Sequence, residues 1–329
     1  MTTYKEIFGK YVKNYSSDPS SDAEGQIWYN TTSGTFKSQV LVAAAWASGG
    51  NLATARQLIA NAGTQTAGLG IGGYTNGAGN RNSTEEYDGT SWGPGGNLPT
   101  ATRAMGGAGT QTAAVAFGGV STGLTGATYE YDGTSWGPGG SLGTSRQQVA
   151  GAGTQTAGLA IGGNVPGGAA ALTNTEEYDG SVWTAGGNLP SAKNHPGGTG
   201  TQTAGLAFGG ATLPGPQTNS TEEYDGSTWT AGGNLNTARA SLGGAGTQTS
   251  SIGFGGYSGP PAITHSNTEK YDGSTWTTTS SLGTARYSCG GAGTQAAGLA
   301  FGGNAGGTSR NATEEFTGDT LTVKTITTS

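Results

Sequence analysis

The sequence predicts an all-β fold built from six repeats, and three observations carry this prediction. The tripeptide Gly-Thr-Gln returns at a spacing of about 46 residues, which is typical of repeat units made of four strands. Glycine accounts for 66 of the 329 residues, and its presence in every candidate helix costs about 1 kcal/mol per residue relative to alanine. The chain also holds 7 Trp, 13 Tyr and 7 Phe at regular intervals, which a disordered tract would lack.

Three sequence markers keep the same period along the chain. The Gly-Thr-Gln tripeptides begin at Gly63, Gly109, Gly153, Gly200, Gly246 and Gly293. A Trp lies near the end of each unit, at Trp46, Trp92, Trp136, Trp183, Trp229 and Trp276. A basic residue marks the start of each unit, at Arg56, Arg103, Arg146, Lys193, Arg239 and Arg286. Such regular self-similarity indicates repeated supersecondary units that stack on one another.

Each repeat divides into four predicted strands. The first follows the basic residue and ends at Gly-Thr-Gln, as in residues 104–110, and the second is an apolar stretch such as TAAVAFGG. The third and fourth are NSTEEYDG and TSWGPGG in residues 82–96. The Asp-Gly between them predicts a two-residue hairpin turn, because Gly accepts a positive φ and Asp tolerates it. Small residues on the second strand fit a sheet that neighbouring sheets approach closely on both faces.

The order of these markers resembles the kelch repeat. In the second copy it reads Arg103, then Gly118-Gly119, then Tyr131-Asp132, then Trp136, and the pattern recurs over roughly residues 46–316. The resemblance implies a six-bladed β-propeller, in which four-stranded blades surround a central channel. The last copy lacks its Trp-bearing strand, whereas residues 43–56 hold such a strand without the other three. We therefore expect the strand around Trp46 to complete the last blade and close the ring.

The links between second and third strands differ in every copy, and loops on a rigid scaffold commonly carry recognition. This irregular face is the candidate binding surface, although the same variation would arise if nothing constrained the loops. Its candidate residues are Tyr74, Thr75, Asn76, Arg81, Tyr257, His265 and Arg310.

The six basic residues are expected near the channel mouth on the same face. We expect each to pair with a carboxylate or carbonyl of the next blade, and an anionic ligand at the mouth is the alternative. Glu pairs such as Glu85-Glu86 are expected on the blade surface, because adjacent residues of a strand point to opposite faces.

Composition argues against several functional classes. The net charge of −6 without a basic stretch gives no electrostatic footprint for nucleic acid. No apolar run approaches the ~18 residues of a membrane helix, and the N-terminus lacks the apolar core of a signal peptide. His195, His265 and Cys289 are too few for a metal site. We therefore expect no cofactor, no metal and no enzyme activity, with a galactose-oxidase-like enzyme as the weakest alternative.

The N-terminal residues lack the repeat. We expect a docking arm over residues 1–24, a β-hairpin and linker over 25–40, and the propeller over 41–329. The hairpin is predicted to pair residues 27–30 with residues 35–38. The aromatic candidates for docking are Tyr4, Phe8, Tyr11, Trp28 and Tyr29. Ordering a segment costs about 1–2 kcal/mol per residue. We therefore expect this aromatic segment to become ordered only where contacts with a partner offset that cost.

Part of this segment resembles N-terminal segments of bacteriophage tail-fibre and other virion proteins. The matching residues are Ser17, Asp18, Pro19, Gly25, Gln26, Ile27, Trp28, Tyr29, Asn30 and Lys37. The resemblance implies a virion structural protein, made in the host cytoplasm and displayed on the particle surface as a tail fibre, appendage or decoration. It implies other virion proteins as partners of the arm, homo-oligomerisation on the particle, and adhesion to a host-surface glycan or protein. The alternative is a cellular kelch scaffold that binds another protein.

Overall fold

The computed structural model describes residues 12–19, 25–165, 170–213 and 215–327, and these residues form an all-β structure without a helix. The all-β prediction is therefore confirmed for this part of the chain. Two compact units are present: Trp46–Thr317, and Met1–Ala45 together with Gly318–Ser329. The larger unit is narrower than the predicted 41–329 range, because the C-terminal strand pairs with an N-terminal one. In the described residues, no helix is long and apolar enough to cross a membrane.

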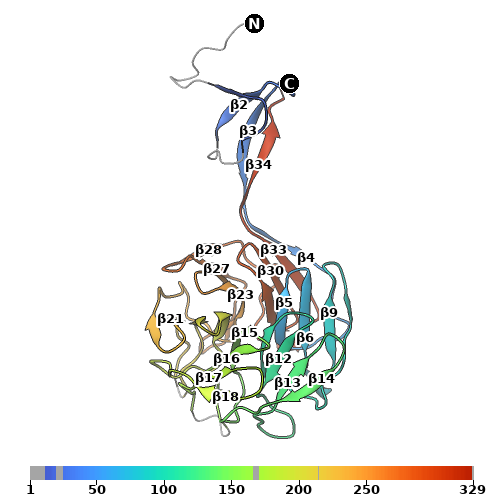
Figure 1. The fold of residues 1–329 in the computed structure, drawn as a ribbon, viewed down its shortest axis with the longest axis vertical. Helices are drawn as coiled ribbons and strands as arrows, with labels where there is room; N and C mark the ends of the chain where they lie inside the picture. Colours follow the sequence, from blue (N-terminus) through green and yellow to red (C-terminus); the bar gives the residue numbers. More distant parts are fainter. Residues whose placement is uncertain (1–11, 20–24, 166–169, 214, 328–329) are drawn as a thin grey trace. The chain divides into compact units, whose positions relative to one another are not determined.

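The larger unit contains six four-stranded sheets in its described residues (Figure 1). The first comprises β5 (Ala60–Thr64), β6 (Ala67–Ile71), β9 (Thr84–Tyr87) and β10 (Trp92–Pro94). The second comprises β11 (Gly106–Gly109), β12 (Ala114–Phe117), β13 (Thr128–Tyr131) and β14 (Trp136–Gly139). The third comprises β15 (Ala150–Thr154), β16 (Ala157–Ile161), β17 (Thr175–Tyr178) and β18 (Trp183–Ala185).

The remaining sheets continue the pattern. The fourth comprises β19 (Gly197–Thr201), β20 (Ala204–Phe208), β21 (Thr221–Tyr224) and β22 (Trp229–Ala231). The fifth comprises β23 (Gly243–Thr247), β24 (Ser250–Phe254), β27 (Thr268–Tyr271) and β28 (Trp276–Thr279). The sixth comprises β29 (Gly290–Gly293), β30 (Ala297–Phe301), β33 (Thr313–Thr317) and the N-terminal β4 (Ala45–Ser48). These repeated four-stranded sheets are consistent with a β-propeller.

The first strands of the sheets are their inner strands. Each contacts the next in the order β5, β11, β15, β19, β23 and β29, and β29 also contacts β5. The apolar core lies between successive sheets: Leu69 and Ile71 of β6, for example, pack with Ala114, Ala116 and Tyr131 of the second sheet. Each sheet is therefore covered on both faces, which explains the small and apolar residues of every second strand.

Repeated side chains link each sheet to the one before it. The Gln of Gly-Thr-Gln donates to two backbone carbonyls of the preceding sheet, as Gln111 does to Gly68 and Tyr87 at 3.1 and 2.7 Å. The Trp indole N–H donates to a Thr hydroxyl of the preceding sheet, as from Trp136 to Thr84 at 3.0 Å. Because every interface uses the same bonds, the same residues recur in each copy.

The predicted two-residue Asp-Gly turn is wrong. Tyr87 pairs with Trp92, so four residues connect the third and fourth strands. The carboxylate of Asp88 accepts the backbone N–H groups of Thr90 and Ser91, both at 2.7 Å, and this Asx-type capping makes the longer turn favourable. Gly89 takes a φ of 92°, which explains the glycine.

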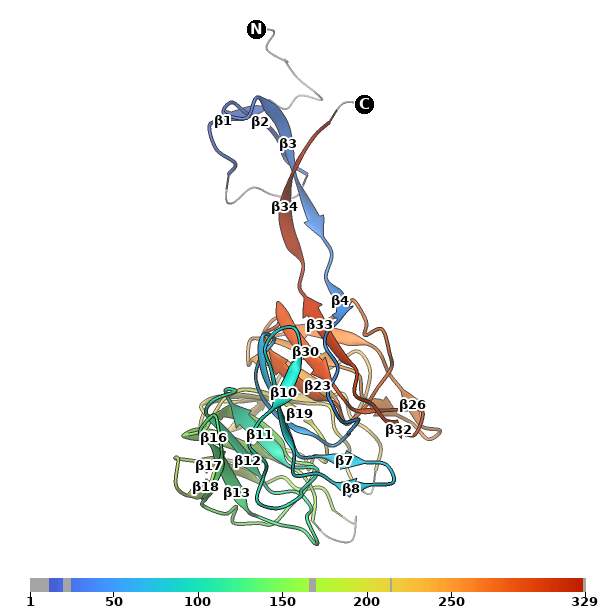
Figure 2. The same ribbon diagram turned by 90° about the vertical axis from the view of Figure 1, so that its right-hand side faces the viewer.

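Three of the irregular links form short ribbons on the same side of the larger unit (Figure 2). The ribbons pair β7 (Tyr74–Thr75) with β8 (Gly79–Asn80), β25 (Tyr257–Ser258) with β26 (Ile263–Thr264), and β31 (Asn304–Ala305) with β32 (Thr308–Ser309).

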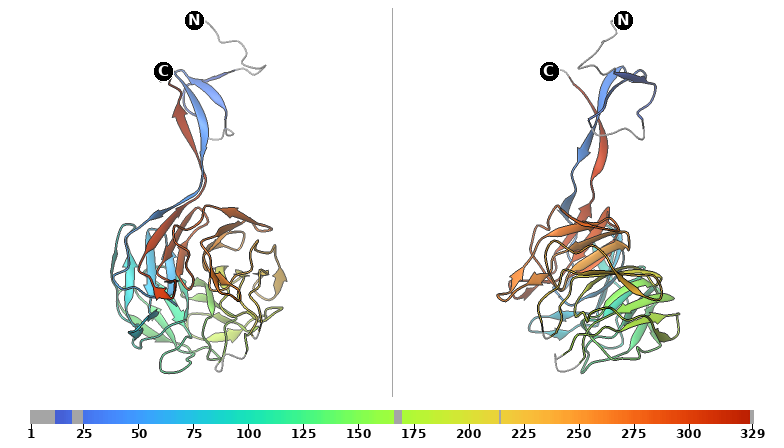
Figure 3. Two further views of the ribbon diagram at one scale, coloured as in Figure 1. Left: turned by 180° about the vertical axis from the view of Figure 1, so that it is seen from behind. Right: turned by 90° about the vertical axis from the view of Figure 1, so that its left-hand side faces the viewer.

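The smaller unit contains one four-stranded sheet, shown from two further sides in Figure 3. Its order is β1 (Lys13–Tyr15), β2 (Ile27–Asn30), β3 (Thr35–Val42) and β34 (Thr320–Thr325). Strands β2 and β3 form the predicted hairpin, and β3 pairs antiparallel with β34.

The carboxylate of Asp18 joins three side chains of this hairpin. It accepts hydrogen bonds from Trp28, Asn30 and Lys37 at 3.2, 2.7 and 2.8 Å, and these contacts lower the pKa of Asp18. Asp18, Trp28, Asn30 and Lys37 thus form one hydrogen-bonded cluster.

Candidate binding site at the channel mouth

Six residues, one from each repeat, have left-handed backbone conformations next to the inner strands. They are Leu58, Ala104, Gln148, His195, Ser241 and Ser288, with φ between 51° and 57°. We call this set the mouth ring. A left-handed conformation costs a non-glycine residue roughly 1–2 kcal/mol, so its recurrence in every repeat requires a compensating interaction.

Backbone hydrogen bonds supply that compensation. Each mouth-ring N–H donates to the carbonyl of the mouth-ring residue in the preceding repeat, at 2.8–3.1 Å, and Leu58 donates to Ser288 so that the cycle closes. Each such bond contributes about 0.5–1.5 kcal/mol. The cycle engages the backbone of all six residues, and their side chains remain to define the chemistry of the mouth.

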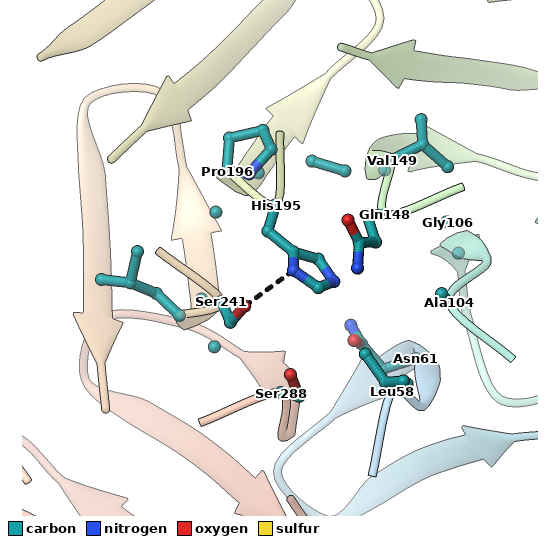
Figure 4. Close-up of a pocket in the computed structure, with 18 of the residues that line it drawn as sticks. Leu58, Asn61, Ala104, Gly106, Gln148, Val149, His195, Pro196, Ser241 and Ser288 are labelled. Atoms are coloured by element: carbon teal, nitrogen blue, oxygen red, sulfur yellow. Dashed lines mark hydrogen bonds between the residues drawn. The ribbon is translucent and has the colours of Figure 1, made fainter. Parts of the chain in front are cut away.

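These side chains surround a cavity of about 90 Å³. Figure 4 shows His195, Gln148 and Asn61 converging on it, with Ser288 and Leu58 at its edge. We call this cavity the cup.

Glycines of the inner strands form the floor of the cup. A Cβ on Gly151 would lie 2.2 Å from the carbonyl oxygen of Gly107, and one on Gly107 would lie 2.6 Å from that of Asn61. The strands therefore approach too closely here for larger residues. A second cavity, also of about 90 Å³, borders the same glycines and is lined mainly by Gly and Ala.

His195 is the most distinctive group of the cup. Its Nδ1 lies 2.8 Å from the hydroxyl oxygen of Ser241. Burial holds the pKa of His195 well below its ordinary value, so the imidazole is neutral at pH 7. Among the described residues no carboxylate contacts this imidazole, and such a weak base activates a serine poorly.

Five of the six basic residues are buried in ion pairs. The pairs are Arg56–Glu85, Arg146–Glu176, Lys193–Glu222, Arg239–Glu269 and Arg286–Glu314. Each carboxylate belongs to the same repeat as its partner and not to the next. These pairs neutralise the cations that an anionic ligand would need.

The expectation that the Glu pairs lie on the blade surface is wrong for their first member. Glu85, for example, is only 5% exposed, because it pairs with Arg56. The second member has a structural partner too: Glu86 accepts a hydrogen bond from the Tyr131 hydroxyl of the next sheet at 2.5 Å.

Arg103 departs from the other basic residues. It follows Thr102, which occupies the position that Arg56 takes in the first repeat, and Tyr129 stands where the other repeats have the paired Glu. Its guanidinium donates to Asn80 at 2.7 Å and lies 5.2 Å from the ring centre of Tyr74. The offset was not predicted, because Arg103 lies one residue after the equivalent position and has the same charge as the other basic residues.

The candidate residues of the irregular face lie in the links but are engaged locally. Tyr74 packs under Arg103, and Arg81 donates to the Thr75 hydroxyl at 2.9 Å. The Asn76 amide donates to the carbonyl of Gly307 at 2.7 Å.

The other three candidates of this face belong to the last two repeats. Tyr257 contacts Tyr287 edge to face, with ring centres 5.4 Å apart. His265 pairs with Ser258 at 2.7 Å, and Arg310 donates to the Ala305 carbonyl at 3.2 Å. None of the seven candidate residues of this face lines the cup.

Two of the docking candidates lie in the four-stranded sheet of the smaller unit, which we call the terminal sheet. Trp28 is fully buried, so it supports the sheet and offers no docking surface, while Tyr29 packs against Phe36 with ring centres 5.1 Å apart. Tyr4, Phe8 and Tyr11 lie outside the described residues.

Comparison with known proteins adds no assignment: the chain matches no family model and no curated protein. Within the described residues, no group of three or more His, Cys, Asp and Glu side chains could hold a metal ion. Cys289 lines the cup as a buried free thiol, and burial raises its pKa to about 11.

The mouth ring itself was not predicted. The mouth-ring position lies two residues after Arg56 and the equivalent positions of the other repeats. Its only signal in the sequence is that the residue type there differs between most repeats.

Proposed function

We propose that this protein is a non-catalytic display protein of a bacteriophage particle, in which a six-bladed propeller binds a host surface and the terminal sheet attaches it to the particle. The mouth ring carries this proposal. The recurring polar side chains are engaged in scaffold contacts, whereas the mouth ring holds Leu, Ala, Gln, His and Ser around an accessible cavity. A rigid repeated frame with one variable site is typical of a binding protein.

Two observations support a single propeller closed by the N-terminal strand. The inner strands contact one another in a complete cycle, from β5 through β29 and back to β5. Trp46 of β4 donates its indole N–H to Thr268 at 3.0 Å, as the other repeat Trp residues do to the sheets before them. Such closure removes unpaired sheet edges.

Exposed apolar side chains support attachment through the terminal sheet. The described residues contain eight exposed large hydrophobics, and six lie in this small unit: Ile27, Leu41, Val42, Leu321, Val323 and Ile326. Leu41 and Leu321 are directly opposed across β3 and β34, at 46% and 45% exposure. A concentration of apolar surface on a small sheet is typical of a region that another protein covers.

The virion setting rests on the resemblance of residues 17–37 to phage virion proteins. Its test is mass spectrometry of purified particles from cells that express the gene. We expect the chain in the particles, and we expect the double variant Leu321→Ser with Val323→Ser to be lost from them. The matched control, Val182→Ser with Ile263→Ser, removes two exposed hydrophobics from the larger unit and should be incorporated normally. Absence of the chain from every particle preparation would overturn the proposal.

A further inference from the structure

We propose that the cup binds one neutral sugar unit at the end of a glycan, an inference that rests on the proposed adhesive function for its biological setting. The evidence lies in the type, number and placement of the groups that line the cup.

The polar groups of the cup carry no net charge and can donate as well as accept. Gln148 supplies an amide, Ser288 a hydroxyl and His195 a neutral imidazole. The Asn61 amide also lines the cup, where its nitrogen donates one hydrogen bond to the Gly291 carbonyl and its oxygen can accept another. A sugar presents several hydroxyls that each donate and accept, which matches this set. Arg103, which directly precedes Ala104, contacts Asn80 and the Tyr74 ring and does not line the cup. The arginines and lysine two residues before the other mouth-ring positions are buried and balanced by Glu partners. The cup therefore does not favour a phosphate or an acidic sugar.

The backbone around the cup argues against a peptide strand as the ligand. A peptide that adds to a sheet needs unpaired backbone N–H and C=O groups. Here the backbone groups of the mouth ring already bond to one another around the closed cycle. Recognition must therefore come from side chains, and these suit hydroxyl groups.

The size of the cup limits the ligand to a single unit. A cavity needs about 10–15 Å³ for each water-sized group that it holds, so the 90 Å³ of the cup accommodates about six to nine such groups. A hexose has twelve non-hydrogen atoms, so the cup can enclose most of one sugar unit but not two. Leu58 and Ala104 provide an apolar wall, against which the C–H groups of a sugar can pack.

A pair of aromatic rings lies beside the mouth ring. Tyr287 directly precedes Ser288 of the mouth ring, and its ring contacts the ring of Tyr257. Tyr257 in turn forms a β-bridge with Ala240, which directly precedes Ser241 of the mouth ring. Both tyrosines are half-buried. Their partly exposed rings provide a surface on which the second unit of a glycan can stack.

The test uses saturation-transfer NMR on the full-length protein. The probes are glucose, galactose, mannose and N-acetylglucosamine, with sialic acid and a neutral tripeptide amide for comparison. We expect saturable binding of at least one neutral sugar and no binding of sialic acid or the peptide. The variants His195→Ala and Gln148→Ala should bind at least tenfold more weakly. Ala104 already occupies an equivalent position, so both variants are compatible with the mouth ring.

His265→Ala is the matched control, because this second histidine belongs to an irregular link and does not line the cup. It should bind the sugar as the natural protein does. The proposal is overturned if no neutral sugar binds the folded protein, if sialic acid or the peptide binds instead, or if His265→Ala weakens binding as much as His195→Ala. Incorporation of His195→Ala into particles should be normal, so loss of the sugar proposal and loss of the virion proposal give different results.

Discussion

The buried ion pair between Arg146 and Glu176 allows a quantitative test of how the repeats are stabilised. The guanidinium lies 3.0 Å from the carboxylate and donates to the carbonyls of Gly162 and Asn174 at 3.1 and 2.9 Å. Arg146→Met removes all three contacts and leaves a buried carboxylate unpaired, which costs about 3–5 kcal/mol. Adding Glu176→Gln removes that charge, while the amide oxygen can still accept the N–H of Gly143. We expect the double variant to recover about 1.5–3 kcal/mol.

The assay is urea unfolding followed by tryptophan fluorescence, applied to the natural protein, both single variants and the double variant. Arg103→Met is the matched control: this half-buried arginine has no carboxylate partner among the described residues, and its loss should cost no more than about 1 kcal/mol. A double variant as unstable as the sum of its single variants would refute the reasoning. So would an Arg103→Met variant as unstable as Arg146→Met.

Three further predictions concern closure, alkaline pH and metals. Trp46→Ala removes the bond to Thr268 and ring contacts with two Phe residues, so it should lower stability by about 3 kcal/mol; an unchanged urea midpoint would contradict closure by this strand. Burial, aided by a hydrogen bond to a Glu, raises the pKa of the five repeat tyrosines to about 12. Folding favours the neutral phenol, so this stabilisation is complete below pH 10 and lost as the pH rises through 12; tyrosinate absorbance that titrates near pH 10 for all thirteen tyrosines of the folded protein would contradict this. Exhaustive chelation should leave the melting temperature unchanged, and stoichiometric copper or zinc in the purified protein would disprove this.

The repeated part of the fold could be predicted because its contacts are themselves repeated. Gln111, Trp136 and their equivalents in the other repeats form hydrogen bonds across the interfaces between sheets, so the same residue types recur at each interface. The length of the repeat and the order of its strands follow from these recurring residues. The all-β class follows from the glycine content as well.

Features that depend on main-chain hydrogen bonds, or on segments far apart in the chain, leave weaker signals in the sequence. The mouth ring is bonded through main-chain atoms, so its residues share no common side chain that a repeat search would detect. The pairing of β34 with β3 joins opposite ends of the chain without a periodic pattern. The burial of Glu85 depends on a cation that lies 29 residues away in sequence, and strand alternation alone could not predict it.

The main-chain construction of the mouth ring separates folding stability from ligand choice. A residue at any of its six positions contributes its N–H and C=O to the cycle, provided that it is not proline and can take a left-handed conformation, as Leu, Ala, Gln, His and Ser do there. Mutations at these positions can therefore accumulate without loss of the frame, and each one alters the lining of the cup. Six such sites, varied together, would give a lineage a large set of related specificities on one unchanged protein, and would give an engineer a compact library with the same property.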